Sequence, residues 1–280
     1  MSKDHPNRPE EANSELEHLE RFSNNTINPY QVITREVDED NEQHVVLTNI
    51  NTRYKKQVPE YNSQYRGRIV EVPEEIYAAS GIRIFGNRIK SLLFSTDVAV
   101  IRNSNADSVM AVYPFTPQGT ITQAIIMSSS VPVFAGVGGG TTTGMRSVNL
   151  AFQAEVMGAF GVVVNAPMKA NVIAEISRNI DIPLIATISS FHDDYIAKLN
   201  AGADMLNISG GAETVQLVRE IRKAVGPNIP IISTGGPTPE SIKETIEAGA
   251  NAITYTPPTS AEIFAEVMKK YRQNLDEPNE

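Results

Sequence analysis

Two adjacent glycines, Gly235 and Gly236, follow the short apolar run Ile229–Ser233 after a single residue, Thr234. Glycine lacks a Cβ atom, so the backbone N–H groups of such a turn can approach a bound anion closely. Further along, Thr259 and Ser260 stand where a helix is expected to begin, and a helix start carries unpaired N–H groups and a partial positive charge. These four residues predict a phosphate-binding site. The alternative for the glycine pair is a tight turn between a strand and a helix.

Other residues at the ends of apolar runs are candidate ligand contacts. Gly210 and Gly211 form a second glycine pair, for which a widened anion site and a simple chain turn are equally supported. Arg102, Asn165 and Asn207 each lie at the end of a further run. Guanidinium and amide groups at such places can bind an anion or a polar ligand. We therefore expect all five residues to contribute to ligand binding.

One lysine and one histidine could carry acid–base chemistry. Lys169 follows the apolar run Gly161–Val164, and His192 follows the run Pro183–Ile188. A lysine in this place can hold an anion or, when desolvated, form a Schiff base with a carbonyl group. A histidine that a carboxylate such as Asp193 orients can move a proton near neutral pH. Lys169, His192 and Asp193 are thus the predicted catalytic residues.

Each of these residues also has a structural interpretation. A lysine at a helix start commonly faces solvent, and Asp193 or Asp194 could cap the helix that follows. One of the two aspartates could also hold a magnesium ion together with a substrate phosphate. A zinc centre of several histidines is not expected, because His192 is the only histidine after residue 44. No cofactor is therefore predicted, and magnesium is the one metal for which candidate ligands exist.

Eight apolar runs must position these residues. Runs without alternating polar residues suit strands that are buried on both faces of a parallel sheet, and amphipathic stretches separate them. The last five runs recur at the interval of one strand plus one helix. This pattern predicts a (β/α)8 barrel. The predicted strands are Val98–Ile101, Val109–Tyr113, Val131–Ala135, Gly161–Val164, Pro183–Ile188, Met205–Ile208, Ile229–Ser233 and Ala252–Tyr255.

The repeat also has a finer structure. Three strands open with an apolar residue and a proline, at Val131-Pro132, Ile182-Pro183 and Ile229-Pro230. The strands between them and the last strand follow a Gly-Ala pair, at Gly158-Ala159, Gly202-Ala203 and Gly249-Ala250. Because the two types alternate, the repeating unit is two strand–helix pairs, a quarter of a barrel.

The beginning of the barrel is the least regular part of the pattern. Only Arg102–Ser108 separates the first two predicted strands, whereas a parallel crossover needs about a dozen residues or more. We expect an extended loop in place of the first helix. The alternative is a hairpin of these two runs, with the first barrel strand upstream. Ile82–Phe94 is predicted as a helix that closes the bottom of the barrel.

The N-terminal part of the chain differs in charge from the rest. The formal charge is −9, and residues 1–44, with four basic and eleven acidic residues, account for −7 of it. Such a segment is expected to be a solvated tail, or alternatively an arm that orders against a neighbouring subunit. Short strands outside the barrel are predicted at Val45–Leu47 and Arg68–Val72. The predicted divisions are an acidic tail 1–44, an extension 45–96 with the closing helix, the barrel 97–273 and a C-terminal tail 274–280.

Composition excludes several classes of function. The chain has no cysteine, which rules out disulfides and thiolate nucleophiles. The remainder beyond the tail is nearly neutral, so a nucleic-acid-binding face is not expected. The first 30 residues hold no signal-peptide core, and no 18 consecutive residues are apolar, so a cytoplasmic protein without a membrane segment is expected. A homo-oligomer is compatible with this composition.

From about Asp97 to Arg272 the chain resembles the phosphate-binding TIM-barrel superfamily. The resemblance rests on the alternating repeat, on Ser-Thr-Gly-Gly ending at Gly236, and on the Ala-Gly-Ala run ending at Ala250. Similar members include aldolases, epimerases and synthases acting on phosphorylated sugars or precursors, and glycerol-3-phosphate-responsive antiterminators that bind a ligand and regulate. The segment Tyr255–Pro258 departs from the second glycine-containing turn of many members, so no catalytic residue is transferred from the resemblance.

The resemblance and the candidate residues together imply an enzyme acting on a small phosphorylated metabolite, of the carbon–carbon lyase or isomerase type. Two alternatives are a non-catalytic sensor of such a metabolite and a hydrolase that uses the His–Asp pair. The fold alone does not choose between them. Lys169 and His192 facing the barrel mouth would favour an enzyme, whereas a mouth of Asn, Thr and Gly would favour a sensor.

Overall fold

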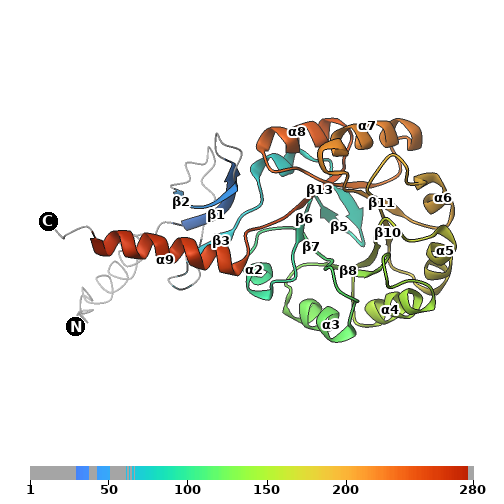
Figure 1. Cartoon of the computed structure of the whole chain (residues 1–280), viewed down its shortest axis with the longest axis horizontal. Coiled ribbons are helices and arrows are strands. Elements are labelled where there is room, and N and C mark those ends of the chain that lie inside the picture. The colour runs from blue at the N-terminus through green and yellow to red at the C-terminus, as the bar shows by residue number, and fades with distance from the viewer. Residues whose placement is uncertain are drawn as a thin grey trace, which may run out of the picture.

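The computed structural model describes residues 30–37, 43–50, 61, 63, 65 and 67–276. Its centre is a closed barrel of eight parallel strands, each paired with the next along the chain and the last with the first (Figure 1). The strands are β6 (Ser91–Phe94), β7 (Ser108–Ala111), β8 (Val133–Gly138), β9 (Gly161–Val164), β10 (Leu184–Ile188), β11 (Met205–Ile208), β12 (Ile231–Thr234) and β13 (Ala252–Tyr255). The predicted (β/α)8 barrel is confirmed.

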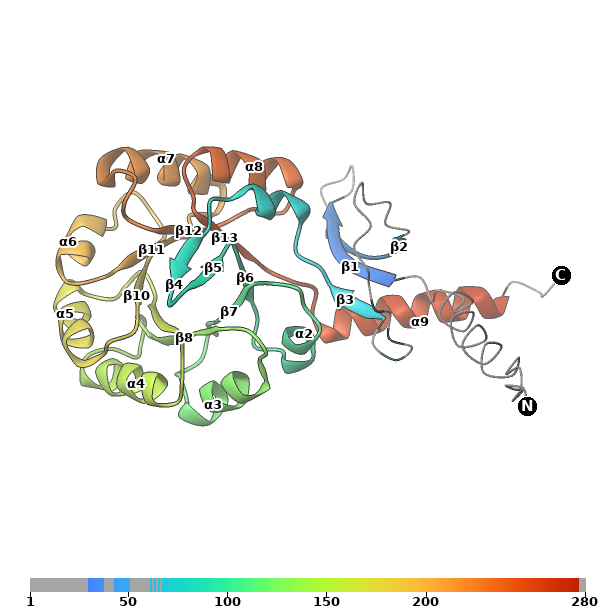
Figure 2. The same cartoon turned by 180° about the vertical axis from the view of Figure 1, so that it is seen from behind.

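Helices connect the strands and surround the barrel (Figures 1 and 2). They are α2 (Val98–Arg102), α3 (Gly119–Ser128), α4 (Met145–Val156), α5 (Ala170–Asn179), α6 (Tyr195–Asn200), α7 (Thr214–Val225) and α8 (Pro239–Glu247), with a short 3₁₀ turn η2 (Gly211–Glu213) before α7. The last helix, α9 (Ser260–Asp276), instead extends away from the barrel. Among the described helices, none has the length and apolar character needed to cross a membrane.

The last seven predicted strands are confirmed, but the first is wrong. Val98–Ile101 lies within α2, and the first barrel strand is β6, so the barrel begins at Ser91 and not at Asp97. The Asp97 side chain caps α2 by accepting hydrogen bonds from the backbone N–H groups of Ala99 and Val100. A short apolar run does not distinguish strand from helix by itself, and here the cap decides. The alternative is correct in placing the first strand upstream, but its hairpin of Val98–Ile101 with Val109–Tyr113 is wrong, because the first of these runs is helical.

The prediction of a helix over Ile82–Phe94 is also wrong, although the segment does close the bottom of the barrel as expected. The segment forms a hairpin of β4 (Ile82–Ile84) and β5 (Asn87–Ile89) before β6 begins. Both turn residues, Phe85 and Gly86, have positive φ angles of 44° and 84°, as two-residue hairpin turns of type I′ require. The hairpin buries isoleucines in the same cluster as the inward side chains of the barrel strands. It therefore closes one end of the barrel.

Aromatic rings join the hairpin to the barrel interior. Phe160 meets Phe85 of the hairpin turn edge to face, with ring centroids 5.2 Å apart, and meets Phe134 of β8 in the same way at 5.9 Å. Phe134 is fully buried inside the barrel. Edge-to-face pairs of this kind add to the stability that burial of the rings provides.

The quarter-barrel repeat has a physical basis at this same end of the barrel. Asp107, Asp204 and Asn251 stand just before β7, β11 and β13, the second, sixth and eighth strands of the barrel. Their side chains accept hydrogen bonds from backbone N–H groups at the start of the preceding strand: Asp107 from Lys90 and Ser91, Asp204 from Leu184, and Asn251 from Ile231. In the remaining quarter the position holds Phe160. Two of the three Gly-Ala pairs, at Gly202-Ala203 and Gly249-Ala250, thus precede a residue that caps the N-terminal edge of the barrel.

A small sheet lies beside the barrel. It has the order β2-β1-β3 and consists of β1 (Tyr30–Val37), β2 (Gln43–Ile50) and β3 (Arg68–Val70). β2 and β3 confirm the two short strands that were predicted outside the barrel. β1 lies within the range assigned to the acidic tail, and Ile33 on it is buried in the main core. Residues 1–29, 38–42 and 277–280 of the predicted tails lie outside the described part of the chain.

The small sheet lies beside α9, on the side of the barrel from which that helix extends (Figures 1 and 2). Helix α9 contacts β2, and the Lys270 ammonium donates to the carbonyl of Leu47 at 2.9 Å. Arg35 on β1 forms a 3.0 Å ion pair with Glu262 of α9. The connection after β3 contains the 3₁₀ turn η1 (Glu74–Ala78), which packs against α8 and buries Ile76. The N-terminal strands therefore reach the C-terminal side of β12 and β13.

Candidate functional site

Inward-facing side chains define the mouth of the barrel. Each strand contributes one residue to the buried cluster that the hairpin closes: Leu92, Met110, Phe134, Val163, Ile185, Met205, Ile232 and Ala252. The residue two positions further along a strand points to the same side and lies nearer the C-terminal end of the strand. We call these eight positions the mouth layer: Phe94, Val112, Gly136, Asn165, Thr187, Asn207, Thr234 and Thr254.

The mouth layer is polar on one side and carries no charge. Its five members on the consecutive strands β9 to β13 carry an amide or a hydroxyl, and none of the eight carries a charge. Asn165 and Asn207, predicted as ligand contacts, both belong to it. The C-terminal end of a barrel is where such folds place their ligand sites, so this arc of amides and hydroxyls is the candidate site.

Two buried atoms of this layer have no hydrogen-bond partner among the described residues. The Asn207 side chain is 7% exposed; its Nδ2 donates to Thr187 Oγ1 at 3.3 Å, but its Oδ1 accepts nothing. The Oγ1 atom of Thr254, in a residue 6% exposed, is also unpaired. A buried polar atom left unpaired costs about 1–3 kcal/mol and calls for an explanation. A bound ligand that pairs with these atoms would provide one.

The predicted glycine pair after β12 is required by packing. A Cβ at Gly235 would lie 2.8 Å from side-chain atoms of both Ile242 and Ile253. Gly236 has φ +77°, and a Cβ there would lie 2.5 Å from the hydroxyl of Ser241. The structure therefore supports the tight-turn alternative for this pair. Whether its N–H groups also hold an anion stays a prediction.

The predicted anion contacts at the start of α9 are occupied by the protein itself. The Thr259 N–H donates to Glu262 Oε2 at 2.8 Å, and the Ser260 N–H donates to Asp97 Oδ2 at 3.1 Å. The hydrogen bond from Thr259 is the main reason that the pKa of Glu262 lies below its ordinary value. For Asp97, burial acts to raise the pKa, but hydrogen bonds from Ser260 and α2 lower it in sum. These two N–H groups are thus not available to a phosphate.

Three other predicted ligand contacts have different surroundings. Arg102 is exposed at the end of α2, which leads back from the mouth, so its placement at a strand end was wrong. The Gly210 N–H donates to Thr214 Oγ1 at 3.0 Å, and a Cβ on Gly210 would lie 2.3 Å from Leu217. Gly211 has φ +60°. The second glycine pair therefore makes the turn into α7, as its structural alternative proposed.

The structure does not connect the predicted catalytic residues. Lys169 is exposed at the N-cap of α5, and its ammonium has no hydrogen bond or ion pair with a described residue. His192 is exposed, and its backbone N–H donates to the Ser190 hydroxyl while its ring bonds to no described residue. The two residues do follow neighbouring strands, β9 and β10. Neither lines the two cavities at the mouth that are described below.

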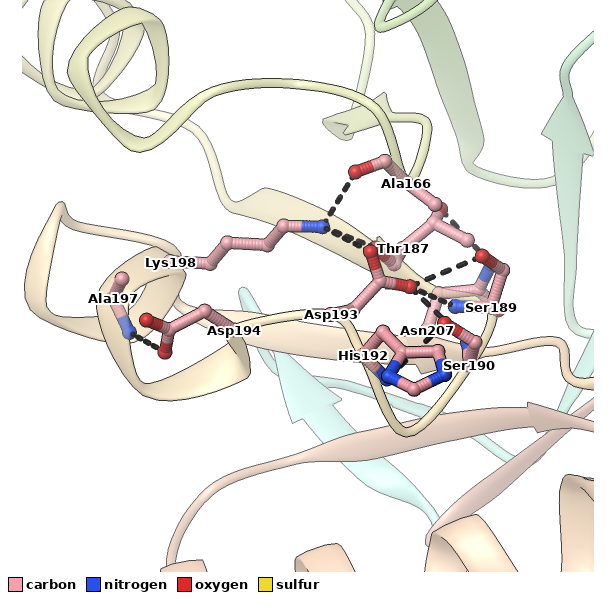
Figure 3. A network of polar contacts seen from close by, with 10 residues as sticks. All are labelled: Ala166, Thr187, Ser189, Ser190, His192, Asp193, Asp194, Ala197, Lys198 and Asn207. Carbon is pink, nitrogen blue, oxygen red and sulfur yellow. Dashed lines mark hydrogen bonds and ion pairs between the residues drawn. The ribbon is translucent and has the colours of Figure 1, made fainter.

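Asp193 organises its own loop and does not orient His192 (Figure 3). Its Oδ2 accepts from the backbone N–H groups of Ser189 and Ser190, at 2.7 and 3.1 Å, and from the Ser189 hydroxyl at 3.0 Å. The neighbouring Asp194 caps α6 by accepting from the Ala197 N–H at 2.8 Å, which confirms the capping expected of one aspartate. Neither carboxylate therefore resembles a free metal ligand. No cluster of three His, Asp or Glu side chains that could hold a metal occurs in the described segments.

A buried lysine that the sequence analysis missed lies beneath this loop. Lys198 on α6 is 5% exposed, and its ammonium donates to the carbonyls of Ala166 and Thr187 at 2.7 and 2.9 Å (Figure 3). It also lies 3.8 Å from Asp193 Oδ1. Burial lowers the pKa of Lys198, and Asp193 and Asp194 oppose that shift. Lys198 thus ties the loop after β9 to β10 and to the loop that follows β10, and it is the only buried residue of α6. Ile196 on the same helix is exposed, so no apolar pattern in the sequence indicated that this lysine is buried.

Two cavities open near the mouth. The smaller, of about 270 Å³, lies under the loop after β8 and is lined by Tyr113, Thr142 and Asn165 among others. The larger, of about 800 Å³, lies between β1 and the ends of β12 and β13. Thr234 and Thr254 of the mouth layer line the larger cavity, together with Gly235 and Gly236. The N-terminal sheet therefore forms one wall of a cavity that reaches the mouth layer.

Comparison with known proteins gives the fold and no family. No protein-family model and no curated protein matches the chain. Among solved structures, phosphonopyruvate hydrolase, in a complex with oxalate and Mg²⁺, is 16% identical over 67% of this chain and 83% of its own, with a TM-score of 0.51. A 2,3-dimethylmalate lyase of the PEP mutase/isocitrate lyase superfamily is 14% identical over 72% and 85%, with a TM-score of 0.51. A phosphoenolpyruvate phosphomutase from Streptomyces platensis subsp. rosaceus is 14% identical over 70% and 83%, also at 0.51.

These similarities cover 67–72% of this chain. The three neighbours are a hydrolase, a lyase and a mutase by name, and they share the barrel with this chain. At 14–16% identity, the similarity establishes the architecture and transfers no residue role. The chain is therefore a (β/α)8 barrel similar in fold to enzymes of the PEP mutase type.

Proposed function

We propose that this protein is a small-molecule-binding barrel that holds a polar metabolite at its mouth layer. The observation that carries the proposal is the pair of buried, unpaired atoms, Asn207 Oδ1 and Thr254 Oγ1. Asn207 Oδ1 can only accept, so the ligand presents an N–H or O–H group to it. The Thr254 hydroxyl can donate or accept. A ligand that pairs with both atoms removes the cost of leaving them unpaired.

The composition of the layer favours binding over catalysis. Its polar members are Asn and Thr, which do not titrate near neutral pH. Proton transfer or covalent chemistry would need a charged or nucleophilic group beside the ligand. Lys169 and His192 are exposed and make no side-chain contact that directs them to the layer. This arrangement supports a sensor or carrier of a small metabolite.

The proposal is tested by ligand-induced stabilisation. A screen of small polar metabolites, phosphorylated and unphosphorylated, should raise the melting temperature for at least one, since a ligand at about 100 times its Kd stabilises by about 2.7 kcal/mol. Thr254→Val and Asn207→Leu should each abolish that shift. Thr245→Val is the control, because Thr245 is a buried threonine on α8 whose hydroxyl bonds to the Ser241 carbonyl, away from the mouth. An unchanged shift in both mouth variants would exclude the site.

Catalysis is the second candidate, and one observation favours it. Lys169 and His192 stand in loops after β9 and β10, which pair directly, so a ligand above the mouth could meet both. The reaction would be a carbon–carbon cleavage or an isomerisation of a small phosphorylated metabolite. Lys169→Met and His192→Gln should then each lower turnover at least about tenfold. Normal turnover in both variants would leave binding as the function. The hydrolase alternative, which needs Asp193 to orient His192, has no such contact to support it.

A further inference from the structure

We propose that the large cavity between β1 and the ends of β12 and β13 selects a ligand with a positively charged amine at its outer end. We name it the β1 cavity. This inference rests on the proposed function, because Thr234 and Thr254 of the mouth layer line the β1 cavity as well. It adds the charge class of the ligand, which the uncharged mouth layer leaves open.

The inner wall of the β1 cavity is built of buried hydroxyl groups. Thr254 and Tyr255 line it, and they are 6% and 9% exposed. The Thr254 hydroxyl makes no hydrogen bond with a described residue. The backbone of Arg35 lies beside the Tyr255 hydroxyl. Burial raises the pKa of Tyr255 to about 12, and the nearby Arg35 opposes that rise. The Tyr255 hydroxyl is therefore protonated at neutral pH. The unpaired Thr254 hydroxyl can bond to the polar body of a ligand.

The outer wall is acidic. Four glutamates line it: Glu36 on β1, Glu74 and Glu75 on η1, and Glu240 in the first turn of α8. Arg35 is the one cation among the described lining residues, and its guanidinium already binds Glu262 at 3.0 Å. Carboxylates gathered around a cleft raise the local concentration of cations and repel anions.

Nearby lysines do not offset the negative charge of the outer wall. Lys243 of α8 lies outside the lining and pairs with Glu75 at 3.8 Å. Even with both cations counted, the carboxylates of the wall outnumber them. A phosphate group in this place would meet the glutamates without a free cation to pair with. The β1 cavity therefore favours an amine over the phosphate that the glycine pair predicted.

The size of the cavity indicates the scale of the ligand. Its volume of about 800 Å³ lies within the usual range of small-molecule pockets, about 300–1,000 Å³. Hydroxyls on the inner wall and carboxylates on the outer wall match a polyhydroxylated molecule with an amine at one end. An amino sugar has this chemistry and serves as the probe.

Three probes with the same sugar ring separate charge from shape. Glucosamine carries an amine, glucose is neutral, and glucose 6-phosphate carries an anion. The full chain, labelled with ¹⁵N, is titrated with each sugar, and the amide shifts of Gly236 and Thr256, which line the cavity, are followed by NMR. We expect glucosamine to bind more tightly than glucose and glucose 6-phosphate to cause no shift at these amides.

Charge-removing variants make the test specific. Glu36→Gln and Glu240→Gln should each weaken glucosamine binding by about two- to fivefold, the effect of one exposed charge pair, and leave glucose binding unchanged. Glu213→Gln is the matched control, because Glu213 is an exposed glutamate beside α7 that does not line the cavity. Its glucosamine affinity should equal that of the unaltered protein.

The outcomes separate this inference from the proposed function. Tighter binding of glucose 6-phosphate than of glucosamine would overturn the amine class; if Thr254→Val abolishes that binding, the mouth site itself still stands. Equal weakening by Glu213→Gln would show that only the overall charge acts, and would also overturn the inference. An absence of shifts with all three sugars at tens of millimolar would do the same.

Discussion

Asn251 and Asn207 occupy opposite ends of the barrel, and they differ in how completely the hydrogen-bonding atoms of their side chains are paired. At the N-terminal end, Asn251 Oδ1 accepts from the Ile231 N–H at 2.9 Å and from Arg222 at 2.6 Å, and its Nδ2 donates to Ser80 at 2.9 Å. At the mouth, Asn207 makes a single long bond to Thr187, and its Oδ1 is unpaired. The N-terminal end satisfies its buried polar groups within the protein. The mouth leaves some buried polar groups, such as Asn207 Oδ1, without a partner among the described residues.

The same contrast holds for the surroundings of the two residues. The N-terminal end is closed by the β4–β5 hairpin and by the edge-to-face rings of Phe85, Phe160 and Phe134. The mouth is bordered by cavities of about 270 and 800 Å³. A barrel of this kind separates stability, at the bottom, from ligand binding, at the top. Substitutions at the two ends should therefore differ in kind as well as in size.

The largest effect is expected inside the closed end. Phe134→Ala removes a fully buried ring that meets Phe160, and should lower the free energy of unfolding by about 3–5 kcal/mol. Phe115→Ala near the mouth, where the side chain is 74% exposed, should change it by less than about 0.5 kcal/mol. Urea unfolding measures both. Equal losses would contradict the division between the two ends.

The two asparagines provide the most direct comparison. Asn251→Leu leaves the Ile231 N–H and the Arg222 guanidinium without this partner and should cost at least about 2 kcal/mol. Asn207→Leu removes an acceptor that is already unpaired and should cost less than about 1 kcal/mol. Melting curves of the two variants, without ligand, measure the difference. Similar costs would mean that Asn207 stabilises the fold through contacts other than this single bond.

A smaller effect is expected from the two lysines of neighbouring loops. Lys198→Met removes the hydrogen bonds to Ala166 and Thr187 but keeps an apolar side chain in a buried place, so it should cost about 1–2 kcal/mol. Lys169→Met, at an exposed position, should leave the melting temperature unchanged. A comparable loss in Lys169→Met would reveal a structural role that its exposure does not suggest.

The smallest effect concerns pH. Because the folded protein holds the pKa of Glu262 below its ordinary value of 4.5, the ionised form stabilises the fold fully above about pH 4.5, and this contribution is lost as the pH falls through the lower folded value. Glu262→Gln should therefore lower stability near neutral pH, by less than about 1 kcal/mol for this 42% exposed side chain, and lose that difference in acid. Urea titrations at about pH 6 and about pH 3 test this. A difference that persists in acid would assign the effect to packing.

The sequence by itself determined most of the barrel, because a run of apolar residues without polar alternation shows that a strand is buried on both faces. The runs from Val109 onwards, without polar alternation, predicted β7 to β13, and the Gly-Ala signal marked the positions where Asp204 and Asn251 cap the preceding strands. It also placed Asn165 and Asn207 at strand ends. Each of these features depends on residues close together in the chain.

Only the tertiary structure decided which polar residues face the site. Val98–Ile101 forms a helix, which the Asp97 side chain caps. Ile82–Phe94 begins with a hairpin, whose isoleucines are buried against the inward side chains at the closed end of the barrel. Lys169 and His192 follow β9 and β10 and stand on exposed loops, whereas Asn207 lies within β11 with a buried side chain. Whether a side chain points into a barrel, and whether its hydrogen bonds are met there, depends on neighbours from distant parts of the chain, and a sequence pattern does not contain those contacts.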